Sequence, residues 1–388
     1  MSFQKLIDLQ LIFSITGKKY LYYFIGVIIL IISVSFVDVA AIGTIYPLLD
    51  NLTNSNQNSG SKFLNFIQKK FNSNSNFFFE IGIIVILILS LLKFLLNLSL
   101  SYFGQKFSLS VHNKISLYLF KKYLNKDYIF FLNVSSASLI RNIITEITFF
   151  TTGILTSFIN LITETILLLF FITLALLINS KITMIVFTLV LILAYLIFIL
   201  TQPKIKTSGR RRFELTEQKI NDVTQALENI KQLKILNAEE IFTRSYDYHN
   251  SRANKQELIF YFFKSLPKNF IEFIILISIV CFLYISKSEE IDLSSHLPLL
   301  GTFALISFRM IPSFSRITVA FQQFSYFKKS ASIIYDELKK EINKNDTQKI
   351  ENIADQIDFQ NQITLQDINY KYKNSKFKLS IPNLIIKK

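Results

Sequence analysis

Long apolar runs without a charged residue constrain this chain more than any other feature of its sequence. The segments 20–37 and 182–202 contain no Asp, Glu, Lys or Arg. A helix of roughly 20 apolar residues is long enough to cross the ~30 Å hydrocarbon core of a bilayer. Hydrophobic residues make up 51% of the chain, which is high for a soluble enzyme. The chain is therefore predicted to be an integral membrane protein.

Four further apolar runs are interrupted by only one or two ionisable residues. The interrupting residues are Lys93, Glu164, Glu272 and the pair Arg309 and Arg316. Counting these runs gives six spans in an all-α polytopic membrane protein. The spans are predicted at about 20–46, 77–105, 147–178, 182–202, 266–286 and 293–325.

The distribution of positive charge predicts the orientation of the spans. The net charge is +15, and most Lys and Arg fall in the segments 1–19, 106–147, 203–268 and beyond 328. Loops rich in Lys and Arg stay on the cytoplasmic side. We therefore expect a multi-pass protein of the cytoplasmic (inner) membrane with a cytoplasmic N-terminus, in contact with membrane lipids. Topology accounts for the basic charge, so nucleic acid is not predicted as a partner.

Residues outside the spans also show helical or strand patterns. Residues 1–18 are amphipathic and predict an interfacial helix. The two long inner connections have apolar residues at helical spacing, such as Val223, Leu227 and Ile230, which predicts that the spans continue as helices into the cytoplasm. Residues 329–360 are polar and predict a linker. Residues 361–388 alternate with period two around a turn at Asn374 and Ser375. A hairpin alone is not stable, so these strands are predicted to belong to a larger domain.

The sequence offers no metal site and no catalytic residue. Its single cysteine, Cys281, lies in a predicted span, and the three histidines are far apart without ligand spacing.

Several strings resemble those of the ABC exporters. YLNKDYIFFLNVSSASLIRNIITEI and NAEEIFTRSYD resemble the first and second coupling-helix regions, and ITLQDINYKY resembles the opening strand of the nucleotide-binding domain. Within the family, SFVDVAAIGTIYPLL and FRMIPSFSRITVAFQQFSYFKKSASIIYDEL are similar to flippases of lipid-linked oligosaccharides. The resemblance implies a type 1 exporter transmembrane domain at 19–328, followed by the first strands of an incomplete nucleotide-binding domain at 361–388.

The resemblance also implies cofactors and partners. Tyr372 would stack on the adenine of ATP, with Mg²⁺ bound by the remainder of that domain. A second half-transporter would complete a homodimer, and segments 128–136 and 236–247 would contact nucleotide-binding domains. The phosphate-binding pattern G-x-x-x-x-G-K-[ST], an LSGGQ-like signature and a Walker B strand do not occur in these residues. We therefore expect the ATPase to lie outside them, and this chain alone to be inactive as an ATPase.

The predicted function is ATP-driven movement of a lipid-linked or other amphipathic anionic substrate across the membrane. A drug or peptide exporter of the same fold and a secondary transporter are alternatives. A secondary transporter gives no reason for the long helical extensions or the terminal strands. A six-span channel would show a regular Arg ladder or a filter loop, and neither occurs.

Four cations at membrane depth are the candidate substrate-binding residues. They are Lys93, Lys268, Arg309 and Arg316. Charged residues inside a membrane are costly and usually functional, and the planar fork of Arg suits phosphate oxygens. A basic lining for an anionic headgroup is one interpretation. Internal ion pairing with Asp38, Glu164 and Glu272 is the other, and Lys268 and Glu272 have the i, i+4 spacing of a helical pair.

Overall fold

The computed structural model describes residues 17–44, 75–178, 180–288, 293–342, 361–371 and 378–387. The chain has two units, Met1–Lys339 and Lys340–Lys388, and each is described by itself.

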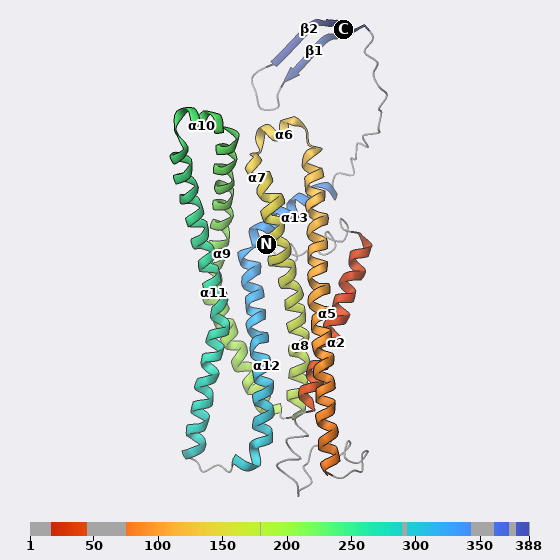
Figure 1. Ribbon diagram of the computed structural model, residues 1–388, viewed down its shortest axis with the longest axis vertical. Coiled ribbons are helices and arrows are strands. Elements are labelled where there is room, and N and C mark those ends of the chain that lie inside the picture. Colours follow the sequence, from red (N-terminus) through yellow and green to blue (C-terminus); the bar gives the residue numbers. More distant parts are fainter. Residues whose placement is uncertain are drawn as a thin grey trace. The chain divides into compact units, whose positions relative to one another are not determined.

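The described residues of the first unit form six long helices, which run alongside one another (Figure 1). Five of the predicted spans lie wholly within helical segments, while the first span runs past the end of its helix into residues outside the described ones. Among the described residues, three helices are apolar and long enough to cross a membrane: Lys18–Gly43, Glu80–Leu124 and Ser136–Leu177. The long helices are α2 (Lys18–Gly43), α5 (Ser75–Leu124), α8 (Thr156–Ile178), α9 (Ser180–Glu228), α11 (Glu239–Ser288) and α12 (Leu293–Tyr326).

Three of these helices are much longer than a membrane requires. Helices α5 and α11 have 50 residues each and α9 has 49. At 1.5 Å per residue each is about 75 Å long, more than twice the thickness of a hydrocarbon core. The helical continuation predicted from the apolar spacing is therefore present.

Short helices join the long ones at one end of the bundle. Helices α6 (Tyr128–Asn133) and α7 (Ser136–Ile140) follow α5, and α10 (Ile230–Leu236) lies between α9 and α11. The α6 and α10 corners lie at the same end of the unit (Figure 1). The α10 corner turns at Asn237, whose φ of 48° is the left-handed conformation that often ends a helix.

Two π-helical segments connect α7 to α8. They are η2 (Arg141–Glu146) and η3 (Phe149–Leu155). The π geometry is rare, and it is frequently found at functional sites. Here it falls where the helix carries two buried ionisable residues, Arg141 and Glu146, within one segment.

The last helix of the first unit, α13 (Lys328–Ile342), is built into the core. It begins the segment predicted to be a linker, yet its apolar face is buried at Ala331, Ile334 and Leu338. These residues pack in one cluster with Ile115 of α5 and Ile154 of η3. Its apolar residues recur at i, i+3 and i+7, which places them on one side of the helix.

Two glycines allow close packing around the joint between α12 and α13. A Cβ on Gly209 of α9 would overlap the backbone carbonyl of Tyr326, and a Cβ on Gly153 of η3 would overlap the ring of Phe327. The connection between α12 and α13 therefore packs against α9 and η3 more closely than a residue with a Cβ would allow.

The second unit contains an antiparallel hairpin. Strand β1 (Gln362–Lys371) pairs with β2 (Lys378–Lys387), with Ile363 opposite Ile386 and Tyr370 opposite Leu379. Both strands lie in the segment 361–388, where the alternation of apolar residues predicted strands. Tyr372 and the predicted turn at Asn374 and Ser375 lie outside the described residues.

Candidate functional site

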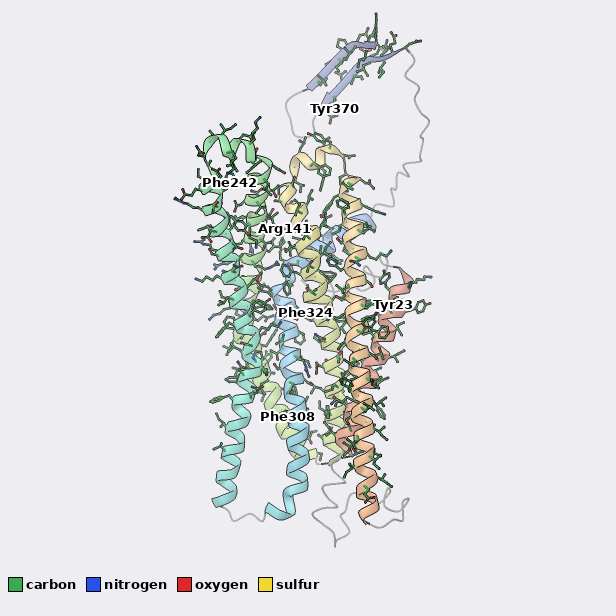
Figure 2. All side chains as sticks on the ribbon, in the orientation of Figure 1. Tyr23, Arg141, Phe242, Phe308, Phe324 and Tyr370 are labelled. Carbon is green, nitrogen blue, oxygen red and sulfur yellow. The ribbon has the colours of Figure 1, made fainter. Side chains whose placement is uncertain are left out.

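Arg316 on α12 is bound to a carboxylate of a neighbouring helix. Its Nε lies 2.5 Å from Oε1 of Glu164 on α8. The Glu164 side chain is 9% exposed, whereas that of Arg316 is 47% exposed. The arginine therefore has a buried partner on one side and an accessible surface on the other. Phe308 of the same helix is exposed (Figure 2). Its carbonyl has no intrahelical donor, because Pro312, four residues later, lacks an N–H.

Lys93 forms the same kind of pair between two other helices. Its Nζ on α5 lies 2.5 Å from Oδ1 of Asp38 on α2. Asp38 is fully buried, and the Lys93 side chain is 29% exposed. Both pairs thus combine a buried acid with a more accessible base.

The remaining two members of the predicted lining differ from this pattern. Lys268 is 3.8 Å from Glu272 of its own helix, α11, and both side chains are exposed. Arg309 lies in α12, but its side chain is outside the described residues. The described contacts join Lys93, Lys268 and Arg316 each to a carboxylate, not to one another. The ion pairs expected under the second interpretation are therefore present for all three.

Polar side chains near the end of α12 tie it to its neighbours. The Gln322 amide donates to Oγ1 of Thr201 on α9 at 3.1 Å and to the carbonyl of Phe263 on α11 at 3.2 Å. Pro267, four residues after Phe263, has no N–H to donate to that carbonyl. Gln322 is fully buried, so it supplies the donor in a place that water does not reach.

Two further hydrogen bonds lie in the same layer. Ser157 of α8 donates to the side-chain oxygen of Gln323, and Gln202 of α9 donates to Ser325 at 3.3 Å. One short stretch of α12 is thus bonded to α8, α9 and α11.

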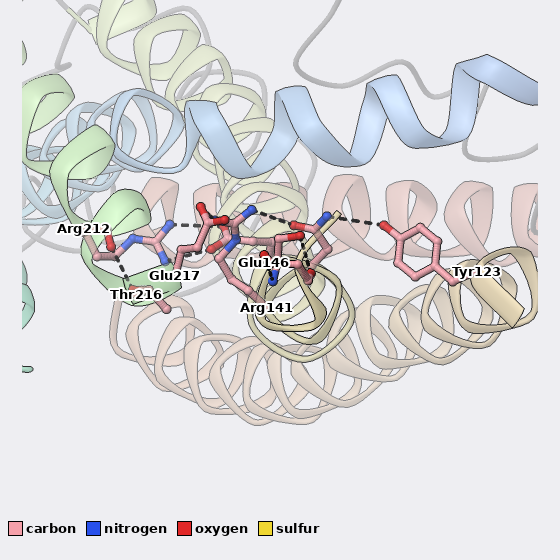
Figure 3. A network of polar contacts seen from close by, with 9 residues as sticks. Tyr123, Arg141, Glu146, Arg212, Thr216 and Glu217 are labelled. Atoms are coloured by element: carbon pink, nitrogen blue, oxygen red, sulfur yellow. Dashed lines mark hydrogen bonds and ion pairs between the residues drawn. The ribbon is translucent and has the colours of Figure 1, made fainter. Parts of the chain in front are cut away.

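A buried ion pair lies closer to the α6 and α10 corners, where α9, η2 and α13 meet (Figure 3). Nη2 of Arg212 is 3.3 Å from Oε2 of Glu146 and 3.1 Å from Oγ of Ser330, and Ser330 donates to the same carboxylate. None of the three is more than 1% exposed. The guanidinium also lies 4.1 Å from the ring centroid of Phe149. A buried charge pair needs such additional partners to offset the loss of hydration.

A chain of polar contacts continues from the start of η2 to α9 and α5 (Figure 3). Arg141 pairs with Glu217 of α9 and donates to Asn142 at 3.1 Å. The Asn142 amide donates to the hydroxyl of Tyr123 on α5 at 3.3 Å. Burial raises the pKa of Tyr123 to about 12, although the hydrogen bond from Asn142 lowers it.

Residues 24–308 match the family model of the ABC transporter transmembrane region. This segment covers well over half of the chain. The protein belongs to the ABC transporter transmembrane-region family. An ABC transmembrane region is embedded in a membrane and serves transport across it, so the predicted ABC transmembrane domain and the transport role are confirmed, while the count of six spans stays a prediction.

The two corners of this ABC transmembrane region contain the segments that resemble coupling helices. Their large apolar side chains are exposed at Tyr128 and Leu132 on α6 and at Leu236 and Ile241 near α10. At the second corner Lys234 pairs with Glu239 at 2.9 Å, and this hydrogen bond lowers the pKa of the glutamate. Contact of these corners with a nucleotide-binding domain stays a prediction.

Sequence reasoning missed several polar residues whose side chains join the long helices of the transporter. The sequence does indicate Gln322 and Gln323, because two adjacent amides inside an apolar helix require hydrogen-bond partners. Arg212 lay in the run Arg210–Arg211–Arg212, where the sequence does not separate the buried residue from its exposed neighbours.

Proposed function

We propose that this ABC transmembrane region is the membrane half of an ATP-driven exporter or flippase. Its substrate is a lipid-linked or other amphipathic anion, with the lipid tail staying in the bilayer. ATP and Mg²⁺ act through a nucleotide-binding domain, and the working unit is a dimer of half-transporters, with an identical chain as the expected partner. All six long helices cross the cytoplasmic membrane, and the N-terminus is cytoplasmic.

The observation that carries the proposal is the half-exposed Arg316 beside the buried Glu164. A guanidinium held from one side by a carboxylate keeps a fixed orientation, and its exposed side offers N–H donors to phosphate oxygens. Lys93, backed by the buried Asp38, repeats the arrangement on another helix pair. Both lie within predicted spans, where charged residues are costly and usually functional.

The mechanism follows from the length of the helices. Closure of the nucleotide-binding domains on ATP would move the α6 and α10 corners, and helices of about 75 Å would carry that motion to the lining. The substrate-binding residues would then become accessible from the outer side instead of the cytoplasmic side, and the cations would release the headgroup.

The decisive experiment separates ligand binding from ion pairing at Arg316. Arg316→Gln, Glu164→Gln and the double variant are compared in vesicles that contain the chain assembled with its ATPase domain. The probe is a fluorescent polyprenyl-diphosphate sugar, and the readout is its ATP-dependent transfer per folded molecule. Arg316→Gln leaves a buried carboxylate without its cation and should lower stability, while the double variant should recover it.

Transport distinguishes the two roles. If Arg316 binds the headgroup, the double variant is stable and still defective in transfer. Recovery of transfer together with stability would show that Arg316 serves only the pair. Arg210→Gln is the matched control, because Arg210 forms an exposed pair with Glu214 on α9.

A further inference from the structure

Helices α9 and α11 are neighbours, and each has a basic segment without Asp or Glu. The two helices are antiparallel neighbours, with Lys219 bonded to Asn250 at 3.4 Å and Lys204 lying 5.5 Å from the ring centroid of Phe263. The segments 202–212 and 258–271 contain no Asp or Glu. Together these segments form a stretch of strongly positive surface.

Four of the basic residues here have no acidic partner. Arg210 pairs with Glu214 and Lys268 with Glu272, so their charges are partly offset. Within the described ranges no carboxylate lies at ion-pair distance from the other accessible members, and we call these four the cationic band: Lys204, Lys206, Arg211 and Lys264.

Aromatic side chains lie at the same level. Tyr261 and Phe262 of α11 are exposed. The Lys264 ammonium is 5.9 Å from the ring centroids of both Phe260 and Tyr261. Aromatic rings beside lysines are typical of a membrane–water interface, where the rings contact acyl chains and the ammonium groups reach the headgroups.

We infer that the cationic band binds the headgroups of anionic phospholipids in the cytoplasmic leaflet. This inference rests on the proposed function for its topology, in which the inner ends of the fourth and fifth spans lie near residues 202 and 266. Lys204, Lys206 and Lys264 lie within four residues of these ends, so their charges stand at headgroup depth, and Arg211 lies about 13 Å beyond the end of the fourth span. Each Lys or Arg near an anionic surface strengthens binding severalfold, and uncompensated cations hold a phosphate most strongly.

The band differs from a set of residues that only fixes orientation during insertion. Such residues act once and need no particular lipid afterwards. A lipid-binding band keeps anionic lipid bound to the folded protein, and the attraction weakens with salt because the band is exposed. Retention of lipid is therefore the quantity to measure.

The test uses the full chain in nanodiscs that contain both phosphatidylcholine and phosphatidylglycerol, and it compares two double variants with the unchanged protein. Lys204→Gln/Lys264→Gln should lower the phosphatidylglycerol retained after purification on the order of tenfold. The control is Lys231→Gln/Lys255→Gln, which removes the same charge from exposed positions nearer the α10 corner and should retain lipid like the unchanged protein. Equal retention by both double variants would overturn the inference.

A second measurement uses the unchanged protein, so that it does not depend on the folding of a variant. Amine-reactive labelling of Lys204 and Lys264 should slow when phosphatidylglycerol replaces part of the phosphatidylcholine, while labelling of Lys231 and Lys255 stays constant. Equal labelling rates in the two membranes would also overturn the inference. Lipid retention without transfer of the fluorescent probe would contradict the proposed function and leave the band intact.

Discussion

Gln322 of α12 supplies the hydrogen bond that the carbonyl of Phe263 on α11 cannot obtain within its own helix. The separation is 3.2 Å, and the missing intrahelical donor is that of Pro267. A proline in a membrane helix is tolerated when neighbouring helices satisfy the freed carbonyl. The carbonyl that Pro267 leaves without an intrahelical donor is thus satisfied from another helix, and positions 322 and 267 should be energetically coupled.

Replacing Gln322 by Leu is expected to destabilise the fold by about 1–3 kcal/mol, because it leaves buried polar groups without a donor. In a Pro267→Ala background the backbone N–H returns, so the same replacement should cost less. Unfolding in detergent of the four proteins in this cycle measures the coupling. Gln323→Leu is the control, since its partner Ser157 does not depend on Pro267. Equal costs of Gln322→Leu in both backgrounds would rule out the coupling.

Arg212→Met should be among the most damaging single substitutions, with a loss of about 3–5 kcal/mol. It leaves Glu146 buried and charged, with Ser330 as the hydrogen-bond donor that remains among the described contacts of its carboxylate. Arg210→Met, two residues away, breaks an exposed pair and should cost about 0–1 kcal/mol. Thermal unfolding of the two variants checks the contrast. A similar small loss for both would mean that the buried pair contributes little.

Gly209→Ala should weaken the packing of α9 against α12. The added methyl group overlaps the carbonyl of Tyr326, and overpacking of this kind costs about 1–3 kcal/mol. Gly104→Ala on α5 has no atom within 4 Å of the new methyl group. There the gain in helix propensity should stabilise the protein by roughly 0.5–1 kcal/mol. Opposite shifts in melting temperature are expected, and a stabilised Gly209→Ala would refute the close approach.

The raised pKa of Tyr123 predicts that the folded protein loses stability at high pH. This pKa rises from 10.0 to about 12 because burial disfavours the ionised phenol. The unfolded chain therefore releases the phenolic proton first, and the stability that Tyr123 contributes below pH 10 is lost between about pH 10 and pH 12. Melting temperatures across this window should fall less steeply for Tyr123→Phe. Identical slopes for the two proteins would contradict the pKa.

The long helices and the strand pair could be predicted from sequence because each depends on local spacing. Apolar runs and helical periodicity located α5, α9 and α11, and the spacing of Lys268 and Glu272 anticipated their contact. The Arg212–Glu146–Ser330 cluster joins residues 66 and 118 positions apart, and local patterns carry no information on such contacts.

The segment after the last predicted span is a second case in which local sequence patterns did not predict the packing. Its polarity predicted a linker, yet Ala331, Ile334 and Leu338 are buried. The i, i+3 and i+7 spacing of these residues was visible, but the mostly polar composition around it favoured a linker. For the candidate lining, sequence named both the cations and the acids that they contact, and the role of the cations stays a prediction.

The burial of α13 also sets the order in which the protein can be assembled. The core cluster that begins at Phe24 of α2 is completed by Leu338. At about 5–20 residues per second, synthesis of the intervening chain takes roughly 15–60 s. On the proposed topology, the apolar residues that α13 covers face the cytosol without this partner during that time. The nascent bundle is therefore open to chaperones and proteases until the ribosome has passed the last predicted membrane helix, and α13 is the segment that ends this vulnerable period.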